Sequence, residues 1–286
     1  MSSMKAIKKR ITSVNNTKKI MKAMNLVAAS KLQKAKGRLD HIRPLYDNLT
    51  QVMDTIKQGL NPDEQIAFAE VREVKSIAYI VLSGDRGLCG GFNTNVSKEA
   101  LAFIESNHGV EEKIIAVGSK GWEYFRRRGK EVVQRFPAAS EASAFADAES
   151  LGHFAANMFL SGEVDEVYVV YTHFESILAH VPHIVKLLPI RSSSSEEKDA
   201  PIDMIYDPDA KTFIENAVPM YMNISLYGAM MESAVCELSN RMTSMDSATR
   251  NASEIIDDLT LEYNRKRQGL ITQEITEIVT GANALN

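Results

Sequence analysis

The chain has 286 residues, 44% of them hydrophobic and 24% charged, which is an ordinary composition for a protein with one or two folded domains. Its formal net charge of −4 is unevenly distributed, because residues 1–43 carry twelve Lys and Arg against one acid, a balance of +11 that leaves −15 for the remainder. No apolar run approaches the length of a membrane span, and no signal or transit peptide is evident. The two cysteines, which form no Cys-x-x-Cys motif, indicate neither a disulfide framework nor a zinc site. We therefore expect a protein of a reducing compartment.

Residues 4–60 are predicted to form one long helix with a coiled-coil seam. Alternate steps of three and four residues from Met4 meet polar side chains only at Lys18 and Asn25, and such a repeat over eight heptads is typical of a coiled coil about 85 Å long. Pro44 is expected to bend this helix without ending it. The seam consists of Met4, Ile7, Ile11, Val14, Lys18, Met21, Asn25, Ala28, Leu32, Ala35, Leu39, Ile42, Tyr46, Leu49, Met53, Ile56 and Leu60.

The glycine loop, residues 83–93 with the sequence SGDRGLCGGFN, follows the apolar run 77–82 and precedes a helical stretch. Its glycines would let the backbone approach a phosphate, but Phe92 and Asn93 follow them where a phosphate-binding loop needs Lys and Ser or Thr, and neither G-x-x-x-x-G-K-[ST] nor G-x-G-x-x-G occurs. Asp85 and Arg86 are candidates for an acid and an anion holder, although such a pair beside glycines more often braces a turn as an ion pair. We therefore expect a structural turn that binds no nucleotide.

Residues 73–206 are predicted to form an α/β domain with a mostly parallel sheet, because short β-rich runs alternate with helical patterns. The β-rich runs are SIAYIVL, EKIIAVG, KEVVQRF, DEVYVVYTHF and HVPHIVKLLPI, and the helical patterns cover 98–106, 119–128 and 145–161. The serine-rich piece RSSSSEEKDAP is expected to be a surface loop near the end of this domain.

A second long helix is predicted to start at Asp207-Pro208-Asp209, where an acidic cap precedes a proline in the first turn. Pro219 is expected to kink its early part. Its seam consists of Ile214, Ala217, Tyr221, Ile224, Gly228, Met231, Val235, Leu238, Met242, Met245, Thr249, Ala252, Ile256, Leu259 and Tyr263. Beyond Tyr263 a stutter shifts the pattern to residues that lack a partner helix in our register, namely Arg267, Ile271, Ile275, Ile278, Ala282 and Leu285.

Two seams with a domain between them predict a fold of the class α/β plus coiled coil. Residues 1–72 and 207–286 form an antiparallel coiled-coil shaft, and residues 73–206 form an inserted Rossmann-like α/β domain. The acids Glu232, Asp246 and Glu262 flank the second seam, and we expect them to face the bases that flank the first, which are Lys8, Arg10, Lys22, Lys31, Lys36, Arg38 and Arg43. Seven bases against three acids leave positive charge for nucleic acid, an anionic membrane or an acidic protein, unless the face is merely solvated.

No set of residues converges on a catalytic or metal site. His180 and His183 are three residues apart on an expected strand and so point to opposite faces, while the other histidines are scattered and no G-x-S-x-G motif occurs. The methionines of both seams are explained by core filling. We expect no catalytic residue, no metal and no cofactor.

Three long segments resemble the hallmark segments of the gamma subunits of rotary ATP synthases, in the same order and at the same ends of the chain: SVNNTKKIMKAMNLVAASKL, SGDRGLCGGFN and RKRQGLITQEITEIVTGANAL. The resemblance extends over all 286 residues and implies a non-catalytic rotor shaft, present in one copy per complex. It implies a helix pair inside a hexamer of alpha and beta subunits, and an α/β domain bound to the epsilon subunit and the ring of c subunits at the cytoplasmic face of a bacterial membrane. Rotation of this asymmetric shaft would drive the catalytic beta subunits through their conformations and couple proton flow, or sodium flow in some members, to ATP synthesis.

The resemblance also assigns residues. It places contacts with beta subunits on Lys22, Met24, Arg241, Arg267, Gln268 and Thr272. In the glycine loop, the residues that match the family pattern, and for which it implies a structural role, are Asp85, Arg86, Gly87, Cys89 and Gly90. Gly84 departs from that pattern, in which a hydroxyl residue is expected, and the chain lacks the cysteine pair that would imply thiol control as in chloroplast relatives.

Two other classes of function remain as alternatives. A small-molecule enzyme built on the α/β domain would need a ligand-sized polar pocket at the strand ends and a convergent catalytic set. A nucleic-acid binder would need aromatic residues or arginines for base contacts, whereas residues 1–43 contain no aromatic residue and mostly lysine among their bases.

Overall fold

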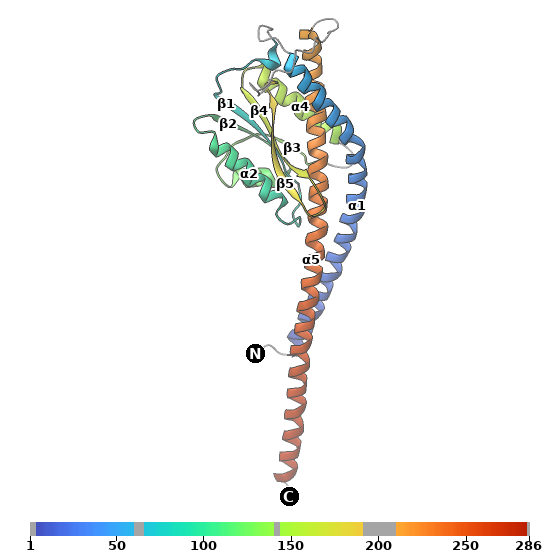
Figure 1. Ribbon diagram of the computed structural model, residues 1–286. Coiled ribbons are helices and arrows are strands. Elements are labelled where there is room, and N and C mark those ends of the chain that lie inside the picture. Colours follow the sequence, from blue (N-terminus) through green and yellow to red (C-terminus); the bar gives the residue numbers. More distant parts are fainter. Residues whose placement is uncertain (1–3, 60–65, 140–143, 191–209, 285–286) are drawn as a thin grey trace. The chain divides into compact units, whose positions relative to one another are not determined.

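The computed structural model describes residues 4–59, 66–139, 144–190 and 210–284, whose elements follow the predicted order (Figure 1). They form two compact units, the shaft unit of residues 1–29 with 241–286 and the α/β unit of residues 30–240, so both long helices contribute to both units. The elements are α1 (Met4–Gly59), a 3-10 turn η1 (Ala67–Ala69), β1 (Ser76–Leu82), α2 (Phe92–Ser106), β2 (Glu111–Val117), α3 (Ser119–Arg126), β3 (Val132–Phe136), α4 (Ala144–Leu160), β4 (Glu166–Phe174), β5 (His180–Leu188) and α5 (Ala210–Ala284).

The α/β unit contains a five-stranded sheet in the order β3-β2-β1-β4-β5. The first four strands in this order are parallel, and β5 pairs antiparallel with β4. The prediction of a mostly parallel sheet is therefore confirmed. All five strands lie where the β-rich runs predicted them, to within two residues at each end.

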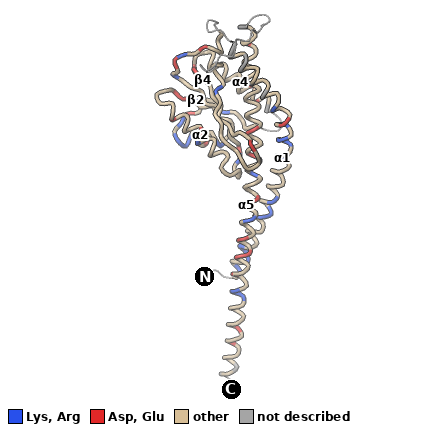
Figure 2. The backbone as a smooth tube through the Cα atoms, viewed as in Figure 1, with Lys and Arg blue, Asp and Glu red and all other residues tan. Residues whose placement is uncertain are grey.

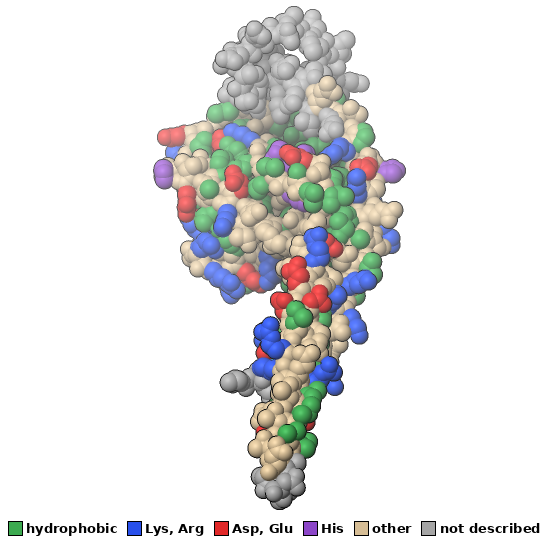
Figure 3. All heavy atoms as spheres, turned by 60° about the horizontal axis from the view of Figure 1, so that its bottom comes forward, with side chains coloured by type: hydrophobic (Ala, Val, Ile, Leu, Met, Phe, Trp, Pro, Cys, Tyr) green, Lys and Arg blue, Asp and Glu red, His purple; other side chains and the backbone are tan. Residues whose placement is uncertain are grey.

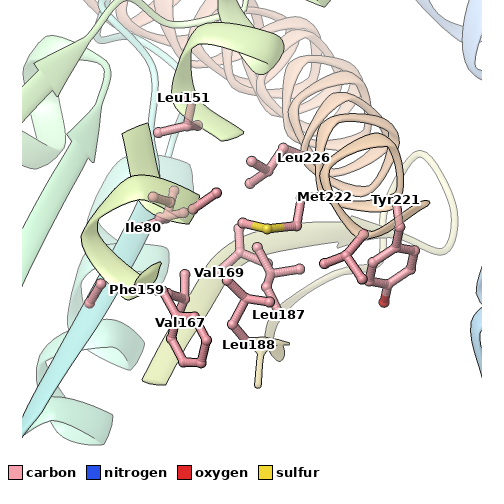
Figure 4. Packing of buried hydrophobic residues seen from close by; sticks show 14 of the residues in the cluster. Ile80, Leu151, Phe159, Val167, Val169, Leu187, Leu188, Tyr221, Met222 and Leu226 are labelled. Carbon is pink, nitrogen blue, oxygen red and sulfur yellow. The ribbon is translucent and has the colours of Figure 1, made fainter. Parts of the chain in front are cut away.

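Strand β1 is buried along its whole length because helices cover both faces of the sheet. Ala78, Ile80 and Leu82 pack in a cluster with side chains of α4 and α5, whereas Tyr79 and Val81 pack in a second cluster with side chains of α2 and α3. Figure 4 shows the first cluster, in which residues of β1, α4, β4, β5 and α5 meet.

Helix α2 begins at Phe92, six residues before the predicted start at Lys98. The intervening sequence is rich in Asn, Thr and Ser, which are weak helix formers, so burial of Phe92 and Val96 outweighs local propensity. Helices α3 and α4 agree with their predictions to within two residues. The serine-rich piece and the predicted start at Asp207 lie outside the described residues.

The two predicted seams are confirmed by burial. Every described seam residue from Met4 to Ile56 and from Ile214 to Tyr263 is buried or half-buried. Pro44 and Pro219 lie inside continuous helices. In the α/β unit, the absence of a side chain at the seam position Gly228 makes room for the ring of Tyr46, which a Cβ atom there would approach to 3.1 Å.

Within the shaft unit a polar contact between the two helices defines their register. Asn25 Nδ2 donates a hydrogen bond of 2.8 Å to the backbone oxygen of Met242. Because the helices are antiparallel, Met4, which is 21 residues before Asn25, lies level with Tyr263, which is 21 residues after Met242. From Arg267 onward every described side chain of α5 is exposed, as the predicted register requires.

The expected charge pairing between the helices is correct for one acid and wrong for two. Glu232 forms an ion pair of 3.0 Å with Arg43 of α1. Asp246 and Glu262 instead pair along α5, with Arg250 at 3.1 Å and Lys266 at 3.0 Å. Both of these pairs have i,i+4 spacing, which brings opposite charges together on one face of a helix without help from a second helix.

Candidate functional site

The glycine loop is tied to the ends of two neighbouring elements through Asp85. Its carboxylate accepts hydrogen bonds from the backbone N–H of Ser119 at 2.8 Å, the hydroxyl of Ser119 at 2.6 Å and the backbone N–H of Ala138 at 3.3 Å. Within the described residues no ion pair joins Asp85 to Arg86, so the predicted turn-bracing ion pair is wrong. The loop is braced by backbone donors at the start of α3 and after β3.

These bonds stabilise the charged form of Asp85. Burial raises the pKa of its carboxyl group, but the hydrogen bonds from Ser119 and Ala138 and the charge of Arg135 outweigh burial, so the pKa lies below its ordinary value. A carboxylate therefore occupies the N-terminus of α3, where a helix binds anions most readily.

A second brace, which the sequence analysis missed, is Asn93 in the first turn of α2. Its Oδ1 accepts a hydrogen bond of 2.7 Å from the backbone N–H of Gly84, and its Nδ2 donates to the backbone oxygen of Arg86 at 3.1 Å and to Cys89 Sγ at 3.2 Å. The available signal was an amide residue directly after a glycine turn, a position where such side chains commonly bond to nearby backbone.

The backbone of the loop turns through left-handed residues. Gly90 has φ 57°, which glycine adopts without strain, but Leu88 also has φ 61° and leaves its side chain 63% exposed. Cys89 between them is buried, as is Cys236, whose pKa is raised by burial. Both thiols of the chain are therefore buried.

Helix α5 occupies the part of the α/β unit where doubly wound sheets bind ligands. Ligands of such sheets lie at the carboxyl ends of the strands where the strand order reverses, which here is the boundary of β1 and β4. Ser233 Oγ lies 3.4 Å from the backbone N of Thr172 in β4, and a Cβ atom on Gly84 would lie 2.8 Å from the carboxyl carbon of Glu237. The pocket between the loop and α5 has about 10 Å³ of free volume, whereas ligand sites have roughly 300–1,000 Å³.

Glu232 joins three elements of the α/β unit at one buried carboxylate, only 6% exposed. Its Oε1 pairs with Arg43 of α1 and its Oε2 lies 2.7 Å from His173 Nδ1 of β4. Arg43 also donates to the backbone oxygen of Phe174 at 3.2 Å. The ring of His173 stacks on that of His183 in β5 at 4.8 Å. The sequence singled out Glu232 and Arg43, but nothing in it identified His173 as their partner.

His180 and His183 contact different neighbours, as their spacing predicts. His183 stacks on His173, whereas His180 packs against Phe174 and lies near Asn240, with a pKa lowered by burial. In the described parts of the chain no group of three or more His, Cys, Asp and Glu side chains could hold a metal ion.

All six predicted beta-subunit contacts lie in the shaft unit, at two levels of its helices. By the register of Asn25 and Met242, Lys22, Met24 and Arg241 share one level. Lys22 is exposed, and the other two are half-buried. The remaining three, Arg267, Gln268 and Thr272, are exposed and begin 26 residues further along α5, roughly 40 Å away at 1.5 Å per residue.

The last turns of α5 present apolar side chains to solvent. Figure 3 shows hydrophobic side chains along this end of the helix, and Figure 2 shows few charges there. The exposed residues are Leu270, Ile271, Ile275, Ile278 and Val279. The prediction of an unpaired apolar segment is confirmed for Ile271, Ile275 and Ile278, while Leu285 lies outside the described residues.

Comparison with solved structures identifies the class of protein to which the fold belongs. A chain of the Euglena gracilis mitochondrial ATP synthase, in a structure of OSCP, F1 and c ring, superposes with a TM-score of 0.72 at 15% identity, covering 99% of this chain and 94% of that one. A chain of the Tetrahymena thermophila mitochondrial ATP synthase, in a structure of the central stalk and c ring, superposes with a TM-score of 0.62 at 23% identity, covering 80% and 99%. The fold is that of ATP synthase central-stalk subunits.

Sequence comparison identifies the family. A family model described as ATP synthase matches residues 3–285. The ATP synthase gamma chain of Alkaliphilus metalliredigens is 41% identical over 290 residues, covering 99% of this chain and 98% of that protein, and that of Desulforamulus reducens is 39% identical over 285 residues, covering both completely. The chain belongs to the ATP synthase gamma chain family, whose members are non-catalytic subunits of an enzyme with its catalytic sites in the beta subunits. This membership supports the shaft interpretation over the alternatives of an α/β enzyme and a nucleic-acid binder.

Proposed function

We propose that this chain is the rotor shaft of an ATP synthase and couples rotation of a membrane ring to conformational cycling of the catalytic beta subunits. The observation that carries the proposal is the apolar end of α5, which continues beyond the helix seam with Ile271, Ile275 and Ile278 exposed. Apolar surface of this kind calls for a partner, and a sleeve of surrounding subunits supplies one.

We assign a different set of partners to each of the two units. Alpha and beta subunits surround the shaft unit, while the epsilon subunit and the c ring bind the α/β unit, with one copy of this chain per complex. In the described part of the chain no helix is long and apolar enough to cross a membrane. We place the protein at the cytoplasmic face of a bacterial membrane, held there by its partners, because the full-length relatives named above come from bacteria.

Two sets of residues are proposed to contact beta subunits. Lys22 and Met24 face an acidic segment of beta, which suits the excess of bases in residues 1–43. Arg267, Gln268 and Thr272 form a second contact further along α5, with Arg241 lower on the same helix.

Native mass spectrometry of the purified complex tests the proposal. We expect one copy of this chain with three copies of each of two larger subunits. A complex that retains those larger subunits at full occupancy without this chain, while still pumping protons, contradicts the proposed function.

Reversing charge on α1 tests its electrostatic part. K22E/K31E is expected to reduce ATP-driven proton pumping while the α/β unit stays folded, whereas either single change is nearly silent, because one exposed ion pair contributes only about 0.2–1 kcal/mol. The control K75E/K98E makes the same change of charge at exposed positions of the α/β unit. Equal pumping by the two double variants would show that the bases of α1 form a solvated face of the helix and contact no partner.

A further inference from the structure

The turn between β4 and β5 is attached to α5 by polar contacts. The hairpin tip is defined as residues 174–181, which include the end of β4, the turn and the start of β5. Ser239 Oγ of α5 donates a hydrogen bond of 2.7 Å to the backbone oxygen of Ile177. One residue further along α5, Asn240 Nδ2 lies 3.4 Å from His180 Nδ1. Asn240 is the last residue of the α/β unit, so the hairpin tip holds α5 at the end of that unit.

The amide of Asn240 requires one protonation state of the His180 ring. Its Nδ2 also donates a hydrogen bond of 2.9 Å to the backbone oxygen of Cys236, which can only accept and therefore fixes the orientation of the amide. Asn240 Nδ2 is thus a donor toward the ring, and His180 Nδ1 must be the nitrogen that carries no proton. The contact exists only with the neutral imidazole.

A protonated His180 ring would meet no acceptor at this contact. Its Nδ1 would become a donor facing the N–H groups of Asn240, and a rotated amide would place Oδ1 against the backbone oxygen of Cys236. Its Nε2 is buried and has no hydrogen-bond partner among the described residues. The ring of Phe174 is tilted by 44° with its centroid 6.1 Å away, at the limit of the roughly 6 Å within which an aromatic face stabilises a cation. Protonation would therefore leave a half-buried charge without a partner, which costs free energy.

Among the described residues, no neighbouring charge offsets this cost. Arg43 of α1 and His173 of β4 both contact Glu232 of α5, and the charge of that carboxylate is shared between them. Burial alone lowers the pKa of His180, and no charged group contributes to the shift. The ionisable side chains of the elements that meet at the hairpin tip are Arg43, His173, Glu175, His183, Glu232 and Cys236.

We propose that the contact between Asn240 and His180 is an acid-sensitive switch, in which protonation of His180 releases the hairpin tip from α5 while the rest of the sheet stays folded. Histidine is the side chain whose charge ordinarily changes between about pH 5 and 8. The bond from Ser239 to the Ile177 backbone contains no group that titrates in this range, so the release is a local opening. The switch is independent of the proposed rotor function, because all of its residues lie in the α/β unit.

The direction of the pH dependence follows from the lowered pKa of folded His180. The contact contributes fully above the unfolded imidazole pKa of about 6.5, and its contribution is lost as pH falls through the folded value. Opening of the hairpin tip should therefore become more frequent below about pH 6.5.

Hydrogen exchange of the full-length chain, corrected at each pH for the intrinsic exchange rate, measures this opening. Between about pH 7.5 and 5, we expect the protection of amides in the hairpin tip to fall several-fold, while that of the buried strand β1 stays unchanged. His180→Phe keeps a ring but cannot be protonated, so it should show no fall. His153→Phe, at an exposed position of α4, is the matched control and should behave as the wild type does.

Asn240→Asp tests the switch from the side of α5. Its carboxylate can accept the Nδ1–H of a protonated ring, so this variant should abolish or reverse the fall in protection. It also decides the matter if His180→Phe does not fold. Any one of four results overturns the switch: no fall in the wild type, an equal fall in β1, an equal fall in His180→Phe, or an equal fall in Asn240→Asp.

Discussion

Asp85 places a carboxylate at the N-terminus of α3, where the unpaired N–H groups of a helix attract negative charge. In a nucleotide-binding loop that position holds a phosphate. Here the protein supplies its own anion, and Asn93 and α5 fill the adjoining space. The glycines serve to turn the chain between β1 and α2.

Asp85→Asn is expected to lower the free energy of unfolding of the α/β unit by about 1 kcal/mol at neutral pH, the usual effect of weakening a helix cap. The folded-state pKa of Asp85 is lowered, so its contribution is complete above the unfolded carboxyl pKa of about 4 and is lost as pH falls through the folded value. Urea unfolding at several pH values should therefore show the difference between wild type and variant shrinking below about pH 4. Asp40→Asn, at an exposed position of α1, is the control. A difference that grows on acidification contradicts the assignment.

Gly118→Ala is expected to destabilise the α/β unit by several kcal/mol, on the order of 3–5. Gly118 has φ 88° and ψ 149°, a region that is almost exclusive to glycine, and a Cβ atom there would lie 2.3 Å from the backbone oxygen of Ser83. Gly109→Ala is the matched control, because Gly109 also has a positive φ of 81° but open space around it, so only about 1–2 kcal/mol of strain is expected. Similar melting temperatures for the two variants would show that the backbone at Ser83 shifts to accommodate the added methyl group without loss of stability.

At the scale of elements, the features set by local pattern were predictable and those set by tertiary contact were not. The seams, the five strands and the exposed end of α5 follow from hydrophobic period alone. The early start of α2 depends on burial of Phe92, and the partnership of Glu232 with His173 depends on packing α5 against β4, which no sequence spacing encodes. The site residues of the glycine loop were located by motif, but their hydrogen-bond partners were not.

Asn25 is expected to fix the register of the helix pair at some cost in stability, as a polar side chain in an apolar seam does. Asn25→Leu should raise the melting temperature of the shaft unit and broaden the distances between spin labels at positions 19 and 251, both exposed. The reason is that Leu adds apolar burial but cannot reproduce the bond to the Met242 backbone oxygen. Lys18→Leu, at the other polar seam position, should stabilise without broadening the distances. Broadening in both variants would mean that the register does not depend on the bond from Asn25 in particular.

The two units of the molecule have different roles. In the α/β unit, Glu232 and its partners connect the sheet to both long helices, and α5 fills the ligand crevice, so the unit is built to hold the helices. Within the described residues of the shaft unit, α1 begins at Met4, level with Tyr263, and α5 continues beyond that level. In a rotor shaft, torque would pass through the paired part, and the single helix would serve as a bearing inside the hexamer.

Two truncations separate these roles. Truncation after Thr280 leaves the helix seam and the apolar residues from Leu270 to Val279 in place, so ATP-driven proton pumping in reconstituted complexes should stay close to wild type. Truncation after Gln268 removes that apolar surface while leaving the seam intact. It should reduce both assembly and the ratio of protons pumped to ATP hydrolysed. The reason is that each large apolar side chain that is buried on assembly contributes about 1.5–3 kcal/mol. Circular dichroism of the isolated variants checks that the helix pair still forms. If both truncated shafts assemble and pump as the full chain does, the exposed end of α5 is not a bearing, and the surrounding subunits must hold the shaft through the level of Lys22, Met24 and Arg241 alone.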